Sequence, residues 1–267
     1  MAIDAPAALS GAAGALLAAE SLDVAVPGRR LVAGLDLALA PGEFACVLGA
    51  NGAGKSLTLS TLAGLRAPAA GRVLLGGRGI GAWPRRERAR RLGLLTQSTE
   101  DPFPGTVFDA VLIGRHPHIE LWQLEGERDL ERAHAVLAEC GLAGFEARAI
   151  DTLSGGERRR VALAALLAQD PAVLLLDEPQ NHLDPHHQLD VLKLLRARAD
   201  QGHAVLATLH DPALAARFAD RVLLLFGDGR WLHGASAEVL NEQSLSELYR
   251  VRMREVRVEG RRLFFGD

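Results

Sequence analysis

The stretch GANGAGKS, residues 49–56, decides how the rest of the chain folds. It fits the pattern G-x-x-x-x-G-K-[ST], in which a glycine-rich turn between a strand and a helix wraps phosphate groups. The apolar run FACVLG leads into it, and we expect a helix to begin near Lys55. In this context a chance glycine turn is the weaker interpretation. Taken alone, the stretch predicts a site for a nucleoside triphosphate and nothing more specific.

The residues of this loop have separate expected roles. Gly49, Gly52 and Gly54 would let backbone N–H groups face the phosphates, and the N-terminus of the following helix favours negative charge there. Lys55 would reach the outer phosphates, and the hydroxyl of Ser56 would hold Mg²⁺. The residues expected to bind the nucleotide are Gly49, Ala50, Asn51, Gly52, Ala53, Gly54, Lys55, Ser56 and Leu57.

A second stretch that carries chemistry is VLLLDEP, residues 173–179. Its four apolar residues are typical of a parallel strand buried on both faces, and two acids follow them directly. We expect Asp177 to bind Mg²⁺, directly or through water. Glu178 would polarise the attacking water, provided that the water lies within hydrogen-bond reach. Two adjacent acids in this position are not typical of surface caps.

Two more polar residues end predicted strands. His210, in ATLHD, ends the predicted strand HAVLATLHD, and Gln97 ends the strand LGLLTQ. A lone histidine is more often structural, but ligands of parallel sheets bind at the carboxyl ends of the strands. We therefore expect His210 to contact the γ-phosphate, and Gln97 to reach Mg²⁺ and the water. The predicted catalytic residues are Glu178, His210 and Gln97, and the predicted Mg²⁺ ligands are Ser56, Gln97 and Asp177.

The hydrophobic pattern around these stretches predicts an α/β fold. Alternation at 22–26 and 35–39 indicates two antiparallel strands, and residues from about 100 to 155 are helical in character. We expect a P-loop (RecA-like) parallel-sheet core with an N-terminal antiparallel β subdomain and a helical insertion subdomain. Residues 1–18 are expected to be an Ala-rich, poorly ordered extension, and 19–267 to form the ATP-binding domain.

Composition and charge argue against several classes of protein. The chain is 48% hydrophobic and 24% charged, with a net charge of -3, so we expect no nucleic-acid partner. The run RRERARR at 85–91 is interpreted as a solvated helix face rather than a nucleic-acid patch. The N-terminus lacks the basic region of a signal peptide, and no apolar run is long enough to cross a bilayer. Cys46 and Cys140 are expected to be buried thiols in a reducing compartment.

Three histidines in NHLDPHH could suggest a metal site. His182, His186 and His187 lack the spacing of a zinc site, and the better interpretation is that they flank the start of a helix. Asp184 would be the N-cap of that helix and Pro185 its first residue.

The stretch LSGGE, residues 153–157, makes the assignment more specific. The motifs GANGAGKS, Gln97, LSGGE, VLLLDEP, NHLD and His210 occur in an order that resembles the ATP-binding-cassette (ABC) ATPases, from about residue 20 to the end. The resemblance implies a head-to-tail homodimer that holds two ATP molecules with Mg²⁺ between its subunits. It also implies that five residues contact the ATP of the partner subunit: Ser154, Gly155, Gly156, Glu157 and Asp184.

Several segments also resemble the importers of ferric siderophores, haem and cobalamin. These are TVFDAVLIGRHPH, DEPQNHLDPHHQLDVL and the ending AEVLNEQSLSELYRVRM. The resemblance implies an ATPase subunit on the cytoplasmic face of the plasma membrane, with two transmembrane permease subunits and a periplasmic or extracellular substrate-binding protein. A groove around Gln97, Glu100 and Phe103 would receive a permease helix. The alternatives are an importer of another cargo and a soluble ABC ATPase that does not transport, such as one for iron–sulfur cluster assembly.

The chain departs from the family pattern at two positions. Val26 stands where the family usually has an aromatic residue that stacks on adenine, so we expect modest discrimination between ATP and GTP. Gln180 stands where Thr or Ser is common.

Overall fold

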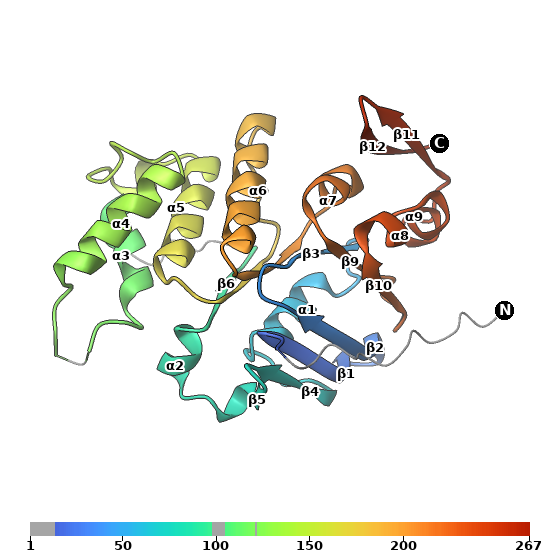
Figure 1. Cartoon of the computed structure of the whole chain (residues 1–267), viewed down its shortest axis with the longest axis horizontal. Helices are drawn as coiled ribbons and strands as arrows, with labels where there is room; N and C mark the ends of the chain where they lie inside the picture. The colour runs from blue at the N-terminus through green and yellow to red at the C-terminus, as the bar shows by residue number, and fades with distance from the viewer. Residues whose placement is uncertain (1–13, 98–104, 121) are drawn as a thin grey trace.

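The computed structural model describes residues 14–97, 105–120 and 122–267. Figure 1 shows a β-rich centre, a helical unit built from α3, α4 and α5 at one end, and the C-terminal elements at the other end. This arrangement confirms the predicted parallel-sheet core with an antiparallel β subdomain and a helical insertion.

The central sheet has the strand order β10-β9-β3-β8-β7-β6. Its first five strands in the chain run parallel to one another, and β10 pairs antiparallel with β9. The strands are β3 (Phe44–Gly49), β6 (Leu92–Leu95), β7 (Val173–Leu176), β8 (Ala204–Thr208), β9 (Arg221–Leu225) and β10 (Trp231–Ala235). Every residue of β3, β7 and β8 is buried, which explains their unbroken apolar runs. Their carboxyl ends meet at one edge, where the predicted site residues follow.

A second sheet, of order β2-β1-β4-β5, forms the antiparallel subdomain. It contains β1 (Leu17–Val26), β2 (Arg29–Leu39), β4 (Ala70–Leu75) and β5 (Arg78–Gly79). The predicted strands at 22–26 and 35–39 were too short, because the hairpin turns tightly at Pro27 and Gly28. The boundary at residue 18 was also wrong, since Leu17 and Ala18 pair with both β2 and β4 and are buried.

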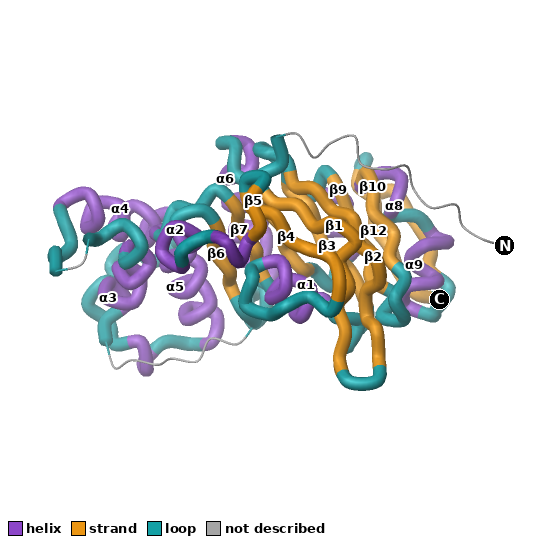
Figure 2. Tube along the Cα trace, turned by 90° about the horizontal axis from the view of Figure 1, so that it is seen from below, coloured by secondary structure: helices purple, strands orange, loops and turns teal. Residues whose placement is uncertain are grey.

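Most of the longer helices either join strands of the core or belong to the helical unit. Helix α1 (Lys55–Leu62) follows the phosphate loop as expected, while α6 (Pro185–Asp200) and α7 (Pro212–Phe218) join strands of the core. The helical unit contains α3 (Val107–Leu112), α4 (Glu127–Glu139) and α5 (Gly155–Ala168), with 3-10 turns at Ile113–Arg115 and Ile150–Thr152. Because α5 packs against α3 and α4, this unit continues past residue 155. In Figure 2 it lies at one end of the molecule, away from the strands of the antiparallel subdomain.

The remaining elements include the predicted C-terminal hairpin. Helices α8 (Ser236–Val239) and α9 (Glu242–Tyr249) precede β11 (Met253–Val258) and β12 (Arg261–Gly266), which pair antiparallel. Near the basic run, a 3-10 turn (Ile80–Ala82) precedes α2 (Arg85–Ala89), which has no buried residue. Its face is not purely solvated, however, because Arg86 and Arg90 both donate from Nε to the Pro117 carbonyl, at 2.9 and 2.6 Å.

The core consists of two apolar clusters on opposite faces of the central sheet. Along β3, Phe44, Cys46 and Leu48 belong to the cluster that includes the helical unit. Ala45 and Val47 belong to the other cluster, shared with the antiparallel subdomain. Both cysteines are free and buried as predicted, and burial raises the pKa of each thiol.

Candidate functional site

The phosphate loop has the backbone conformation that its glycines predict. Gly52 and Gly54 adopt φ angles of 76° and 101°, in the left-handed region that favours glycine. A Cβ atom at Gly54 would lie 3.1 Å from the Cβ of Leu31, so a larger residue would crowd the loop against β2. The side chain of Lys55 folds over the loop and donates from Nζ to the carbonyls of Gly49 (2.8 Å) and Ala50 (3.3 Å). Burial lowers the pKa of Lys55, and the nearby charges of Glu178 and Asp177 oppose that shift.

Asp177, the first acidic residue after β7, forms a hydrogen bond with a residue of the neighbouring strand β8. The Thr208 hydroxyl, at the end of β8, donates to Oδ1 of Asp177 at 2.7 Å. The same hydroxyl accepts a hydrogen bond from the backbone N–H of Glu178, also at 2.7 Å. Asp177 is 4% exposed, and no second hydrogen bond within the described residues ties its carboxylate. Its remaining oxygen is therefore available as a hard ligand of the kind that Mg²⁺ prefers.

Glu178 is the centre of a convergent polar group. Its Oε2 accepts from Nε2 of Gln97 at 2.8 Å and from the Asn181 amide, and its Oε1 lies 2.5 Å from Nε2 of His210. The Glu178 side chain is almost fully buried. Burial of a carboxylate without partners would be costly, and the hydrogen bonds from these three side chains offset that cost. The three predicted catalytic residues, which are far apart in sequence, thus meet at one carboxylate.

A cleft of about 530 Å³ joins the phosphate loop to this carboxylate. The residues that line it are Leu31, Asn51, Gly52, Gly54, Lys55, Ser56, Leu57, Gln97, Glu178 and His210. Of the predicted nucleotide-binding residues, Gly49 and Ala53 are buried behind this surface and Ala50 lies outside the lining. Val26 packs half-buried against the core, and Leu31 is the apolar residue of the β1–β2 hairpin that lines the cleft.

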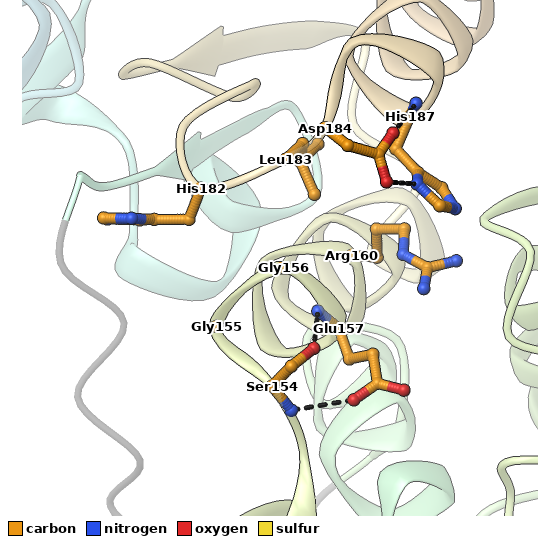
Figure 3. Close-up of a pocket in the computed structure, with 9 residues that line it drawn as sticks. All are labelled: Ser154, Gly155, Gly156, Glu157, Arg160, His182, Leu183, Asp184 and His187. Carbon is orange, nitrogen blue, oxygen red and sulfur yellow. Dashed lines mark hydrogen bonds and ion pairs between the residues drawn. The ribbon is translucent and has the colours of Figure 1, made fainter.

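The residues expected to face a partner subunit form a separate pocket (Figure 3) of about 500 Å³. Ser154 is the N-cap of α5; its Oγ accepts from the Glu157 N–H at 3.3 Å, and Glu157 Oε2 accepts from the Ser154 N–H at 2.7 Å. Gly155, Gly156 and Asp184 line the same pocket, at the positive end of the helix dipole. This pocket shares no lining residue with the cleft at the phosphate loop. The two glycines after Ser154 therefore do not serve that cleft within one chain.

The histidines beside this pocket have structural partners. Asp184 caps α6, accepting from the His187 N–H at 2.9 Å, and its Oδ2 lies 2.7 Å from Nδ1 of His187. His186 lies 3.2 Å from Asp190. Within the described ranges, no group of three or more histidine, cysteine and acidic side chains is placed to hold a metal ion. Glu100 and Phe103, named for a permease groove, lie outside the described residues.

Four residues that contact the site were not singled out in the sequence. Thr208, Arg159 and Leu31 reach it because the packing of the fold brings distant segments together, whereas Asn181 lies three residues after Glu178 in the same loop. Thr208 could have been noticed, because it ends the strand beside β7. Arg159 stood in a run of three arginines, with nothing in the pattern to distinguish it from its neighbours.

A family profile described as "ABC transporter" matches residues 32–181, which is more than half of the chain. The chain belongs to the ABC transporter family. It is 44% identical to "Hemin import ATP-binding protein HmuV" of Gloeobacter violaceus, over 81% of this chain and 80% of the relative. A protein of the same name from Pseudomonas fluorescens is also 44% identical, over 88% of this chain and 92% of the relative.

Solved ABC transporter structures have the same fold. An inward-facing metal-chelate type ABC transporter superposes with a TM-score of 0.82 at 27% identity, over 95% of this chain and 98% of that one. The structure of cbiO1 from Clostridium perfringens, part of the transporter complex cbiONQ, has a TM-score of 0.73 at 27% identity, over 87% and 93% of the two chains. In this ABC protein, no helix within the described residues is both long and apolar enough to cross a membrane.

Proposed function

We propose that this chain is the ATP-hydrolysing subunit of an ABC importer. The observation that supports it most is the convergence of Gln97, Asn181 and His210 on the buried Glu178 carboxylate, which faces the phosphate loop across one cleft. One ligand in this cleft could therefore contact both the phosphate loop and the candidate general base.

The donor set of the cleft fits ATP with Mg²⁺. The glycine backbone and Lys55 suit the phosphates, because the loop presents N–H groups and one buried positive charge. Ser56, Gln97 and Asp177 offer the oxygen ligands that would hold Mg²⁺. The ion, when bound, would neutralise charge that develops on the phosphates.

Glu178 is the proposed general base. Its carboxylate would accept a proton from the attacking water, while Gln97 and Asn181 hold Oε2 and so fix the direction of the carboxylate. Nε2 of His210, next to Oε1, would orient toward the γ-phosphate and keep Glu178 in place. Turnover then requires that these hydrogen bonds be exchanged as the nucleotide enters.

The complete site needs two chains in this proposal. The pocket at Ser154, Gly155 and Gly156 is separate from the cleft of the same chain, and its helix N-terminus and exposed glycine backbone suit a phosphate. A head-to-tail homodimer would place this pocket, with Glu157 and Asp184, against the ATP held by the phosphate loop of the partner.

The relatives support a cargo class and a location. Because the named relatives are hemin import proteins, we favour an iron chelate, with haem first, over cobalamin as the cargo. The chain would work at the cytoplasmic face of the plasma membrane with two permease subunits, and a substrate-binding protein would deliver the cargo.

Substitution of Glu178 tests this function. Glu178→Gln should keep ATP binding, because the amide preserves the shape of the side chain, and should lose hydrolysis because it cannot accept the proton. The measurements are steady-state ATP hydrolysis and the Kd of a fluorescent ATP analogue. Hydrolysis near the wild-type rate would exclude Glu178 as the base. Uptake of haem into vesicles containing the chain and its permease would then test the cargo.

A further inference from the structure

The side chain of Arg159 lies directly behind the site, in the second turn of the helix that Ser154 caps. It is 3% exposed. Its two terminal nitrogens donate hydrogen bonds to backbone carbonyls that follow two different strands. Nη1 donates to the carbonyls after β6, Thr96 at 2.5 Å and Gln97 at 3.4 Å. Nη2 donates to the carbonyls after β7, Glu178 at 2.9 Å and Asp177.

This contact acts on a strained part of the backbone. Glu178 has a φ of 51°, a left-handed conformation that costs on the order of 1–3 kcal/mol for a residue with a side chain. Its N–H is held by the Thr208 hydroxyl, and its carbonyl accepts from Arg159 and from the Asn181 N–H (3.1 Å). The guanidinium is therefore one of the groups that keep Glu178 in the conformation that points its carboxylate at Gln97 and His210.

The positive charge of Arg159 also interacts favourably with the two acids of the site. Burial lowers the pKa of the guanidinium, and the charges of Asp177 and Glu178 oppose that shift. Its Nε has no hydrogen-bond partner within the described residues. A buried arginine with an unsatisfied Nε is costly, so the four carbonyl contacts and the two acids must compensate.

We propose that Arg159 is a positioning residue, which fixes Glu178 and Gln97 of its own chain from the signature helix α5. This inference rests on the proposed function, because it assigns Arg159 a role through Glu178. One helix then carries both the pocket for the partner's nucleotide and the group that holds the hydrolytic site of its own chain. A shift of α5 would be transmitted to both strand ends at once.

The test compares two buried arginines in the purified full-length protein. Arg198 is a matched control: it is 7% exposed, its Nε also lacks a partner, and it bonds to Glu139 and Gln201, away from the site. Arg159→Met should lower kcat about a hundredfold, the loss expected when a catalytic group moves by about 1 Å, with little change in ATP affinity. Arg198→Met should lower the unfolding midpoint and leave kcat near that of the wild type.

A double substitution distinguishes a role that acts through Glu178 from a general effect on the fold. If Arg159 acts through Glu178, adding Arg159→Met to Glu178→Gln should not lower the residual rate further. Multiplicative losses, or an Arg159→Met rate equal to that of Arg198→Met, would overturn the inference. If Arg159→Met does not fold, Arg159→Lys replaces it: one ammonium cannot hold both strand ends as two separate nitrogens do, so kcat should still fall. Wild-type turnover by Glu178→Gln alone would instead refute the proposed function.

Discussion

Replacing Ser154 by arginine should leave the single chain folded but abolish ATP hydrolysis by the dimer. Ser154 is exposed, so the longer side chain has room in the single chain. The reciprocal cap has two halves, and the substitution removes only the one that uses the serine hydroxyl, the 3.3 Å bond from the Glu157 N–H. The other half, from the Ser154 N–H to Glu157 at 2.7 Å, uses the backbone and remains. The free energy of unfolding should therefore fall by about 1 kcal/mol.

The same substitution should abolish hydrolysis while ATP binding persists. The cleft that contains Lys55 shares no residue with the Ser154 pocket, so the affinity of one chain for ATP should not change. The bulk of an arginine side chain at the N-terminus of α5 would occupy the space that the partner's nucleotide needs and would cover the N–H groups that face it.

The control for Ser154→Arg is Asn241→Arg. Asn241 is an exposed N-cap with its own reciprocal cap, on α9. This variant should lose similar stability and keep its activity. The assays are chemical denaturation, binding of a fluorescent ATP analogue and phosphate release. If Ser154→Arg hydrolyses ATP like Asn241→Arg, the assignment of this pocket to a partner's nucleotide is wrong.

Two further predictions concern nucleotide choice and pH. None of the described residues that line the cleft is Phe, Tyr or Trp. The preference for ATP over GTP in steady-state hydrolysis should therefore stay below about a hundredfold, or roughly 2.7 kcal/mol. A larger preference would show that a group outside this lining contacts the base. Burial, with Arg221 nearby, lowers the pKa of His233 from 6.5 to about 4. The unfolded chain therefore binds a proton in this range that the folded chain excludes, and the free energy of unfolding should decline as the pH falls from about 6.5 toward 4. Denaturation at pH 7.5 and 5 should show a smaller decline for His233→Gln, which cannot be protonated; equal declines would mean that His233 does not contribute.

The sequence predicted those parts of the site that follow buried strands. Asp177 and His210 were predictable because parallel strands place their carboxyl ends at one edge, and Lys55 because its loop has a spacing that few other structures share. The contacts of Arg159 and Thr208 were not predictable, since they depend on which strands are neighbours and on how deeply α5 packs. Leu17 and Ala18 were misassigned because an Ala-rich run shows no alternation, although pairing with β2 and β4 makes it a strand.

In the proposed dimer, the phosphate loop of one chain meets the Ser154 pocket of another. Cross-linking between two single-cysteine variants tests it most directly, because Asn51 and Ser154 are exposed whereas Cys46 and Cys140 are buried. Asn51→Cys and Ser154→Cys chains, mixed with ATP and Mg²⁺ under mild oxidation, should form a disulfide-linked pair on a non-reducing gel. Neither variant alone should do so to the same extent, and omission of ATP should reduce the yield. Absence of this pair in a preparation that still hydrolyses ATP would contradict the two-chain site.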